Sequence, residues 1–302
     1  SSKNQQLDMV LRDGVELNEV NIVTRKLGTM KLRSSVMNED MISRAELSRA
    51  ACCNLGESFV TNPSVDVSYS DAATGAKQIK LLGLSGTYVQ MLTENIPNYR
   101  GAAAPYGLGY VPGPWMQSIQ VSKGTSSVKN GYEAITGQIN VEFKKPQLPE
   151  ADWVSANLFA STTNRYEANA DATLKLSKRW STSLLAHYEN ETKAHDGNDD
   201  GFVDIPQVEQ YNVWNRWAYM GDHYVFQAGI KALSETRTSG QANHGGTMHS
   251  GDLYKVGIDT ERYEFFTKNA YIFNKEKNTN LALILSTTLH NQDATYGRKL
   301  YN

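Results

Sequence analysis

Apolar and polar residues alternate with a period of two through most of the second half of the chain. Within residues 166–178, one face holds Ala168, Ala170, Ala172, Leu174 and Leu176, and the other holds Glu167, Asn169, Asp171, Thr173, Lys175 and Ser177. Successive side chains of a β-strand point to opposite faces, so this pattern predicts strands with one apolar and one polar face. About seven such strands are expected, at 152–162, 166–178, 180–192, 211–221, 223–237, 261–274 and 279–293.

The connections between these strands alternate between short and long. The pairs at 164–165 and 178–179 are tight turns, whereas 193–210 and 238–260 are long polar loops. Short turns on one side and long loops on the other are typical of an antiparallel transmembrane β-barrel. Aromatic residues suited to the two membrane interfaces are Trp180, Tyr188, Trp214, Trp217 and Tyr219.

The first half has a different texture, which predicts a mixed α/β domain over 25–147. Ser43 followed by Glu46 is a capping box that starts a helix, and Gly56 is its expected end. The segment "TGQINVEFKKP" alternates as a strand near the end of this domain. We therefore divide the chain into an arm at 1–24, an α/β domain at 25–147 and barrel strands at 148–302.

Composition narrows the function classes. The 302 residues carry a net charge of −2, which gives no sign of a nucleic-acid partner. No nucleophile–base arrangement or phosphate-binding glycine loop is visible, so we do not expect an enzyme. The adjacent Cys52 and Cys53 would form a strained bridge, and two small buried thiols are the favoured interpretation.

The segment "MQSIQVSKGTSSVKNGYEAITGQINVEFKKP", residues 116–146, resembles the closing part of the plug domain of TonB-dependent outer-membrane receptors. Gly124, Gly131, Gly137 and Asn140 fall where that motif has them. Two departures concern polar contacts between plug and barrel. Leu82 and Thr125 stand where the motif usually has arginine and proline.

The resemblance implies an α/β plug followed by transmembrane β-barrel strands in the bacterial outer membrane. It further implies a barrel of about 22 strands, which seven strands cannot close, so we expect a fragment of a longer polypeptide. The implied function is active import of a scarce nutrient, a siderophore, metal complex, haem or corrinoid. The implied partners are that ligand, membrane lipid and the C-terminal domain of TonB. The alternatives are a passive porin-like or structural barrel and a soluble β-rich binding module.

The N-terminal arm contains a candidate coupling site. The segment Glu19, Val20, Asn21, Ile22 and Val23 resembles a TonB box. A free extended segment of this kind can pair with an exposed sheet edge of a partner. The alternative interpretation is an ordinary strand of the plug.

The loop "DGNDDGFVD" predicts a bound divalent cation. Asp196, Asn198, Asp200, Phe202 and Asp204 occupy positions 1, 3, 5, 7 and 9 of a calcium-binding loop, and Gly201 occupies position 6. Position 12 is Gln207 instead of a bidentate glutamate, although Glu209 follows soon after. We expect a structural Ca²⁺ of modest affinity, and the alternative is a solvated acidic loop.

A second long loop offers softer ligands. His244, Met248 and His249 combine imidazole and thioether groups that suit a soft metal or a haem iron. The alternative is a polar surface loop with no bound metal.

Overall fold

The computed structural model describes most of the chain in several stretches. These are residues 30–31, 38–50, 53–60, 62–85, 88–125, 133–147, 153–242, 254–275, 277 and 279–301. None of the helices in those stretches is long and apolar enough to cross a membrane. The predicted boundary at 147/148 borders residues that are not described, so it stays a prediction.

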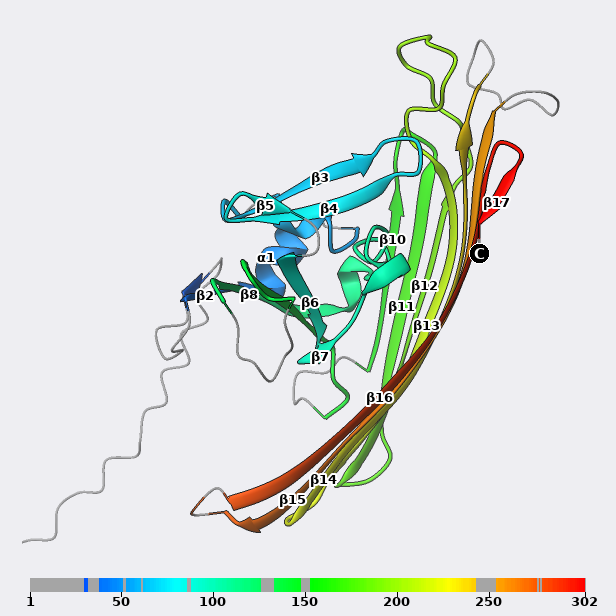
Figure 1. Ribbon diagram of the computed structural model, residues 1–302. Coiled ribbons are helices and arrows are strands. Elements are labelled where there is room, and N and C mark those ends of the chain that lie inside the picture. Colours follow the sequence, from blue (N-terminus) through cyan, green and yellow to red (C-terminus); the bar gives the residue numbers. More distant parts are fainter. Residues whose placement is uncertain are drawn as a thin grey trace, which may run out of the picture.

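The second half forms one antiparallel sheet in which each strand pairs with the next along the chain. We call this sheet the wall. Its strands are β10 (Val154–Ala160), β11 (Arg165–Lys175), β12 (Trp180–Glu191), β13 (Gln207–Met220), β14 (Tyr224–Gly240), β15 (Lys255–Asn274), β16 (Thr279–Tyr296) and β17 (Lys299–Tyr301). All seven predicted strands are present, and the short β17 adds an eighth. The sheet is strongly curved, and its concave side faces the first half of the chain (Figure 1).

The described part of the first half, which we call the plug, contains two small sheets. The larger has the order β1-β2-β8-β9-β6-β7 and the smaller is β3-β4-β5. The strands are β1 (Met30–Lys31), β2 (Asn38–Ser43), β3 (Val65–Asp71), β4 (Ala76–Leu81), β5 (Leu84–Ser85), β6 (Val89–Thr93), β7 (Ile96–Pro97), β8 (Met116–Lys123) and β9 (Gly137–Phe143). The helical turns are α1 (Arg44–Arg49), η1 (Glu57–Phe59), η3 (Gly101–Ala103) and η4 (Gly113–Trp115). Among these strands, β6 and β9 form the parallel pair.

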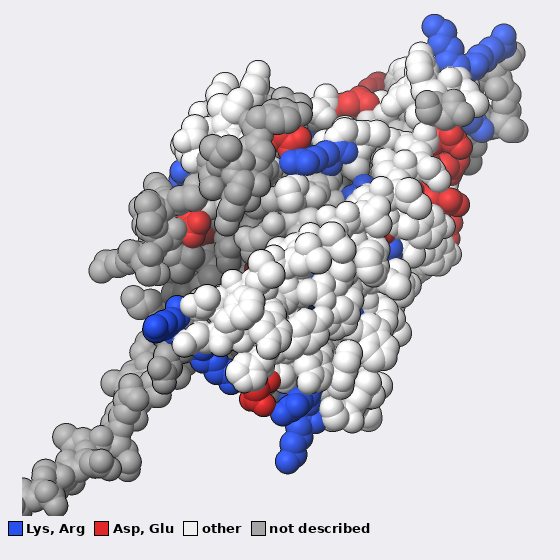
Figure 2. Space-filling view, turned by 60° about the horizontal axis from the view of Figure 1, so that its bottom comes forward, with Lys and Arg blue, Asp and Glu red and all other residues white. Residues whose placement is uncertain are grey.

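The polar face of each wall strand points inward. On β13 the even-numbered residues from Val208 to Ala218 are buried, and the odd-numbered ones are more exposed. Outward positions on β16 carry exposed leucines at 281, 283, 285 and 289. Figure 2 shows a broad surface free of acidic and basic residues, with charged side chains gathered toward its ends. An apolar outer face against a polar inner face is the arrangement expected of a sheet with lipid outside.

One hydrophobic core joins the plug to the wall. Ile119, Ile139 and Phe143 are fully buried, and they cluster with Leu185 and Trp214 of the wall. The rings of Phe143 and Trp214 meet edge to face with centroids 4.5 Å apart. Aromatic pairs in this geometry stabilise by about 0.5–1.5 kcal/mol beyond the area they bury. The plug is therefore packed onto the wall through a shared hydrophobic core.

The structure corrects two predictions of local detail. Helix α1 starts at the predicted cap, where Ser43 Oγ accepts from the Glu46 amide at 3.4 Å. The helix ends at Arg49 instead of near Gly56, because residues 53–60 form turns and the short 3-10 helix η1. Trp214 is 3% exposed and faces the plug, so its predicted place in an outer aromatic belt is wrong. Its neighbour Trp217 faces outward and is 41% exposed.

Gly137 allows β8 and β9 to approach at the start of β9. Its φ is +152°, and a Cβ there would lie 2.1 Å from Ser122 O and 2.5 Å from Leu81 Cδ2. We expect Gly137→Ala to lower the free energy of unfolding of the plug by about 1–3 kcal/mol, as overpacking does. The measurement is amide hydrogen exchange of β9 in the folded protein.

Gly257 provides the control for this substitution. It lies in β15, and a Cβ there would meet nothing within 4 Å. Gly257→Ala should leave exchange in the plug unchanged. Equal protection of β9 in the Gly137→Ala and wild-type proteins would contradict the assignment of Gly137 as a close-approach position.

Candidate functional site

The candidate site is the seam where plug side chains meet the polar inner face of the wall. The wall places acidic and basic residues on its buried face because inward and outward positions alternate along each strand. Buried charges are costly unless they are paired and hydrogen-bonded. In this seam the pairing crosses between plug and wall at several places.

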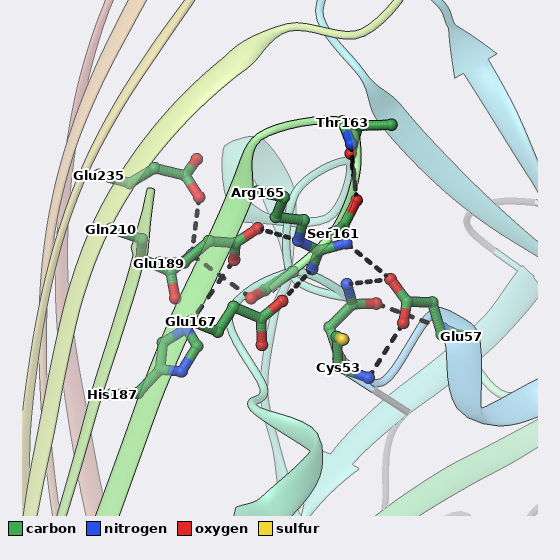
Figure 3. Close-up of polar contacts among 12 residues, drawn as sticks. Cys53, Glu57, Ser161, Thr163, Arg165, Glu167, His187, Glu189, Gln210 and Glu235 are labelled. Atoms are coloured by element: carbon green, nitrogen blue, oxygen red, sulfur yellow. Dashed lines mark hydrogen bonds and ion pairs between the residues drawn. The ribbon is translucent and has the colours of Figure 1, made fainter. Parts of the chain in front are cut away.

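The first crossing is centred on Arg165, at the start of β11. Its guanidinium contacts Glu57 of η1 at 3.0 Å, Glu167 of the same strand at 2.7 Å and Glu189 of β12 at 2.9 Å. Figure 3 shows the three carboxylates around the one guanidinium, with His187 close to Glu189. We call these four residues, Arg165, Glu57, Glu167 and Glu189, the Arg165 cluster. It joins two wall strands to the plug through a single cation.

Glu57 is oriented by its own domain. Its carboxylate accepts from the Cys53 amide and from Asn54 Nδ2, both at 3.0 Å. Cys53 is a free, buried thiol, as predicted, whereas Cys52 lies outside the described residues. Burial, followed by the charges of Glu167 and Glu57, raises the pKa of the Cys53 thiol well above its usual value. The thiol is therefore neutral and is not a reactive thiolate.

The second crossing is an ion pair at Glu94, in the turn between β6 and β7. Its side chain is 2% exposed, and its carboxylate lies 2.6 Å from Arg216 and 3.5 Å from Lys268 of the wall. Burial alone would raise the pKa of Glu94, but Arg216, Lys145 and Lys268 outweigh it and hold the pKa below its usual value. Glu94 is therefore a buried anion that depends on cations of the wall.

The third crossing joins β15 to residues just after β7. Glu264 accepts from Asn98 Nδ2 at 2.9 Å and pairs with Arg262 at 2.7 Å. Arg262 also donates to Asn98 Oδ1, so the amide side chain is held at both ends. Lys231 of β14 donates to Tyr99 Oη at 3.2 Å. These contacts hold Tyr99 in a left-handed conformation, φ +54°, which costs a non-glycine residue free energy.

The predicted calcium loop lies between β12 and β13, and its carboxylates hold its own backbone. Asp196 accepts from the amides of Asp200 and Gly201, at 3.1 and 3.0 Å. Asp200 accepts from the Phe202 amide at 2.8 Å, and Asp204 from the Gly197 amide at 2.7 Å. The Asn198 side chain contributes at both its ends, accepting from the Asp200 amide and donating to the Asp200 carboxylate. The predicted ligands are thus gathered into one compact loop.

Two predicted sites lie outside the described residues. They are the TonB-box-like segment at 19–23 and the loop with His244, Met248 and His249. In the part of the chain that the structure describes, no group of three or more His, Cys, Asp or Glu side chains is placed to hold a metal ion.

The seam residues were missed as a site because period-two alternation shows only which face is polar. The sequence does contain a signal for the seam, because charged residues recur at inward positions of the strands. Examples are Glu167, Glu189, Arg216 and Lys231. An inward charge every few residues requires a polar or oppositely charged surface opposite it. The identity of the partner, Glu57 or Glu94, depends on tertiary packing.

Comparison with protein families gives one match within the plug. Residues 31–138 match the model of the TonB-dependent receptor plug domain. A curated relative is the vitamin B12 transporter BtuB of Vibrio vulnificus, 24% identical over 185 residues. That alignment covers 61% of this chain and 30% of the transporter, so the chain spans about a third of the length of this relative.

Solved structures show the same fold. The closed form of the ferric-catecholate import receptor Fiu of Escherichia coli K12 superposes with a TM-score of 0.69 at 16% identity, over 90% of this chain and 41% of that one. The ferripyoverdine receptor of Pseudomonas aeruginosa gives 0.68 at 13% identity, over 88% and 36%. The siderophore receptor PiuA of Acinetobacter baumannii gives 0.66 at 13% identity, over 86% and 37%.

The family match falls on the domain that packs against the concave side of the wall, and the structural matches extend through both parts of the chain. Receptors of this class are bacterial outer-membrane proteins, which agrees with the apolar outer face and polar inner face of the wall. Residues 31–138 match the plug domain of the TonB-dependent receptors, and the antiparallel strands that follow have the fold of the first barrel strands of such receptors.

Proposed function

We propose that this chain is the N-terminal part of an active importer that takes a scarce metal complex, a siderophore or a corrinoid, across the outer membrane. The energy is supplied by TonB, acting on the N-terminal arm. The observation that carries the proposal is the seam. A plug held against the lumen face of the wall by buried ion pairs blocks free passage, so transport requires work on the plug.

The seam also separates this proposal from the alternatives. A passive pore needs an open lumen, whereas the described plug residues share a core with the wall. A soluble binding module has no use for an outward face bearing exposed leucines on β16. The siderophore and corrinoid classes are supported by what the similar receptors are named for: ferric catecholate, ferripyoverdine and vitamin B12.

The test is uptake by the full-length receptor in cells that lack their own receptors for these complexes. Cyanocobalamin, a ferric catecholate siderophore and haem are supplied separately, with and without TonB. The proposal expects uptake of one of them, and it expects that uptake to disappear without TonB. Entry that is independent of TonB, or diffusion of small sugars through the protein, would overturn the proposal.

The coupling segment at 19–23 generates a further prediction. Val20→Pro removes a backbone donor that strand addition to TonB requires. We expect uptake to be abolished while binding of the complex at the cell surface is unchanged. Val15→Pro, five residues upstream, is the matched control and should transport normally. Normal uptake by the Val20→Pro receptor would sink the assignment of the box.

The ion pair at Glu94 generates a prediction about stability. Glu94→Gln keeps the shape of the side chain but leaves Arg216 and Lys268 without their anion, which should cost about 3–5 kcal/mol. Glu133→Gln is the control, because Glu133 pairs with the half-exposed Arg100 and such pairs contribute about 0–1 kcal/mol. Denaturant unfolding of the purified full-length receptor measures both.

The same pair has a pH dependence of known sign. Because the pKa of Glu94 is lowered by folding, its contribution is complete above the usual value of 4.5 and is lost as pH falls through the folded value. The difference between wild type and Glu94→Gln should therefore shrink in acid. A difference that stays constant from pH 7 to pH 3 would contradict this account.

We further propose that the acidic loop binds Ca²⁺ as a structural ion. Support comes from the ligand spacing and from the side chains of Asp196 and Asn198, which both accept a hydrogen bond from the Asp200 amide. The aspartates of the described loop are not grouped to hold an ion in the present arrangement, so binding requires their carboxylates to turn away from the loop amides. A divalent cation would remove the repulsion among these carboxylates, and Ca²⁺ accepts about 6–8 oxygen ligands in flexible geometry. No enzymatic step is part of this proposal.

Calorimetry on the full-length receptor tests the calcium site. Asp200→Asn should weaken Ca²⁺ binding at least about tenfold, because a ligand charge is lost. Asp199→Asn is the matched control, because it removes the same charge from the same loop. Among the described residues, the Asp199 carboxylate takes part in none of the hydrogen bonds of the loop. Equal effects of the two substitutions, or no binding by wild type, would reduce the loop to a solvated acidic surface.

A further inference from the structure

A small polar cavity lies between the β3–β4 hairpin of the plug and the wall. Its volume is about 80 Å³, and its lining comes from both sides of the seam, including Lys77 and Tyr69 of the hairpin and Glu191 of β12. Arg237 of β14 also lines it and donates to Thr74 O in the hairpin turn at 3.2 Å. The cavity is therefore adjacent to the contact that holds the hairpin tip against the wall.

Glu191 is the unusual acid in this cavity. It is 7% exposed, and among the described residues its carboxylate accepts no hydrogen bond and lies within ion-pair distance of no cation. The other two carboxylates of the lining are paired, Glu189 with Arg165 at 2.9 Å and Glu235 with Arg237 at 3.0 Å. The charges of Arg165, His195 and Arg237 act on Glu191 from a distance, without a direct contact. A largely buried carboxylate that lacks a direct partner is costly.

Lys77 is the corresponding base on the plug side. Its ammonium group forms no ion pair or hydrogen bond with a described residue, and it lies 5.4 Å from the centre of the Tyr69 ring. Burial lowers the pKa of Lys77; the charge of Glu57 opposes this, and Arg165 and Arg237 reinforce it. Its stem runs past η1, where Lys77 Cδ is 3.4 Å from the position of a Cβ on Gly56.

These two charges have opposite sign, come from the two sides of the seam and line one cavity. The gap between them is polar and has room for a few water molecules, which would hydrate both groups. Direct contact would replace that hydration by a charge-assisted hydrogen bond of about 2.7–2.9 Å. Contact needs a shift of the hairpin, since the side chains do not meet in the present arrangement.

We infer that Lys77 and Glu191 are partners in a second arrangement of the plug, in which the β3–β4 hairpin moves toward β12 and closes this cavity. The arrangement described above is then the open position of a latch. The inference rests on the proposed function in one respect. Transport requires the plug to move, and that movement gives the second arrangement of the hairpin a role. In transport, the latch would hold the hairpin against the wall while other parts of the plug rearrange.

Two features of the β3–β4 hairpin bear on a small displacement of this kind. Its turn contains Gly75, with φ +66°, where a Cβ would lie 2.7 Å from Pro206 Cγ at the end of the acidic loop. The β3–β4 pair also has a register shift between Tyr69 and Asp71, which bends the strand near its end. Gly75 is therefore in close contact with the wall in the present arrangement. The second arrangement requires this contact to open, and the glycine and the bulge are the positions that take up the backbone change.

The experiment measures the distance between the hairpin and the wall in the full-length receptor. Nitroxide labels are placed at Ala73→Cys on the exposed hairpin turn and at Lys193→Cys, an exposed position just after the end of β12, with Cys52 and Cys53 replaced by alanine. Electron-electron double resonance is recorded with and without the TonB C-terminal domain. We expect a second, shorter distance population in at least one of the two samples.

Charge variants identify the cause of that population. Lys77→Met and Glu191→Gln should each remove the short-distance population, and Lys77→Arg should keep it. The double exchange of Lys77→Glu with Glu191→Lys should restore the short-distance population. Lys80→Glu changes the charge on the same strand and is the matched control, which should leave the population unchanged. A single distance in the wild-type receptor under both conditions overturns the latch, as does a short population that survives in both single variants.

A separate measurement tests the proposed function. Calorimetry on the same samples reports whether the TonB domain binds. Absence of binding contradicts the proposed energy coupling, but the distance distributions of the wild-type and charge variants still decide the latch.

Discussion

Burial of charge between the plug and the polar face of the wall is the constraint on which the rest of this structure depends. A sheet with lipid on its outer face must place its polar residues inward, and here those residues include Arg165, Glu189, Arg216 and Lys231. In water they would be solvated, but the plug excludes most of that water. The plug therefore has to bring its own charges, and Glu57 and Glu94 meet this need at two separate places. Complementary charge makes plug and wall specific for each other.

The two ion pairs differ in how far each partner depends on the other. Glu57 is also bound by the Cys53 amide and Asn54, and Arg165 also pairs with two carboxylates of the wall. Glu94 has only wall cations within ion-pair distance among the described residues. A buried ion pair is weak evidence for stability, yet removing one partner is strongly destabilising. The contact at Glu94 is thus the more costly of the two to separate.

Much of the fold was predictable, because strand alternation and turn length are local properties. The strands β11 to β16 appear close to their expected positions, and the capping residue Ser43 starts α1. Features that depend on neighbours in space were not predictable. Trp214 and Trp217 lie three positions apart on β13 and therefore face opposite sides of the sheet, but alternation alone does not say which side the plug covers. Phe143 of the plug packs on Trp214 and makes it a core residue. The pairing of Glu57 with Arg165 joins positions 108 residues apart, a separation that no local pattern encodes.

The order of strands in the larger plug sheet has a mechanical consequence. Strand β9 is an inner strand, paired with β8 on one side and β6 on the other, and it is also the last plug strand before the wall. Ten residues, 144–153, separate its end at Phe143 from the start of β10 at Val154. Even fully extended, that tether spans only about 35 Å. Strand β9 can therefore move away from the first strand of the wall only as far as this connection reaches, and any rearrangement of the plug must stay within that distance.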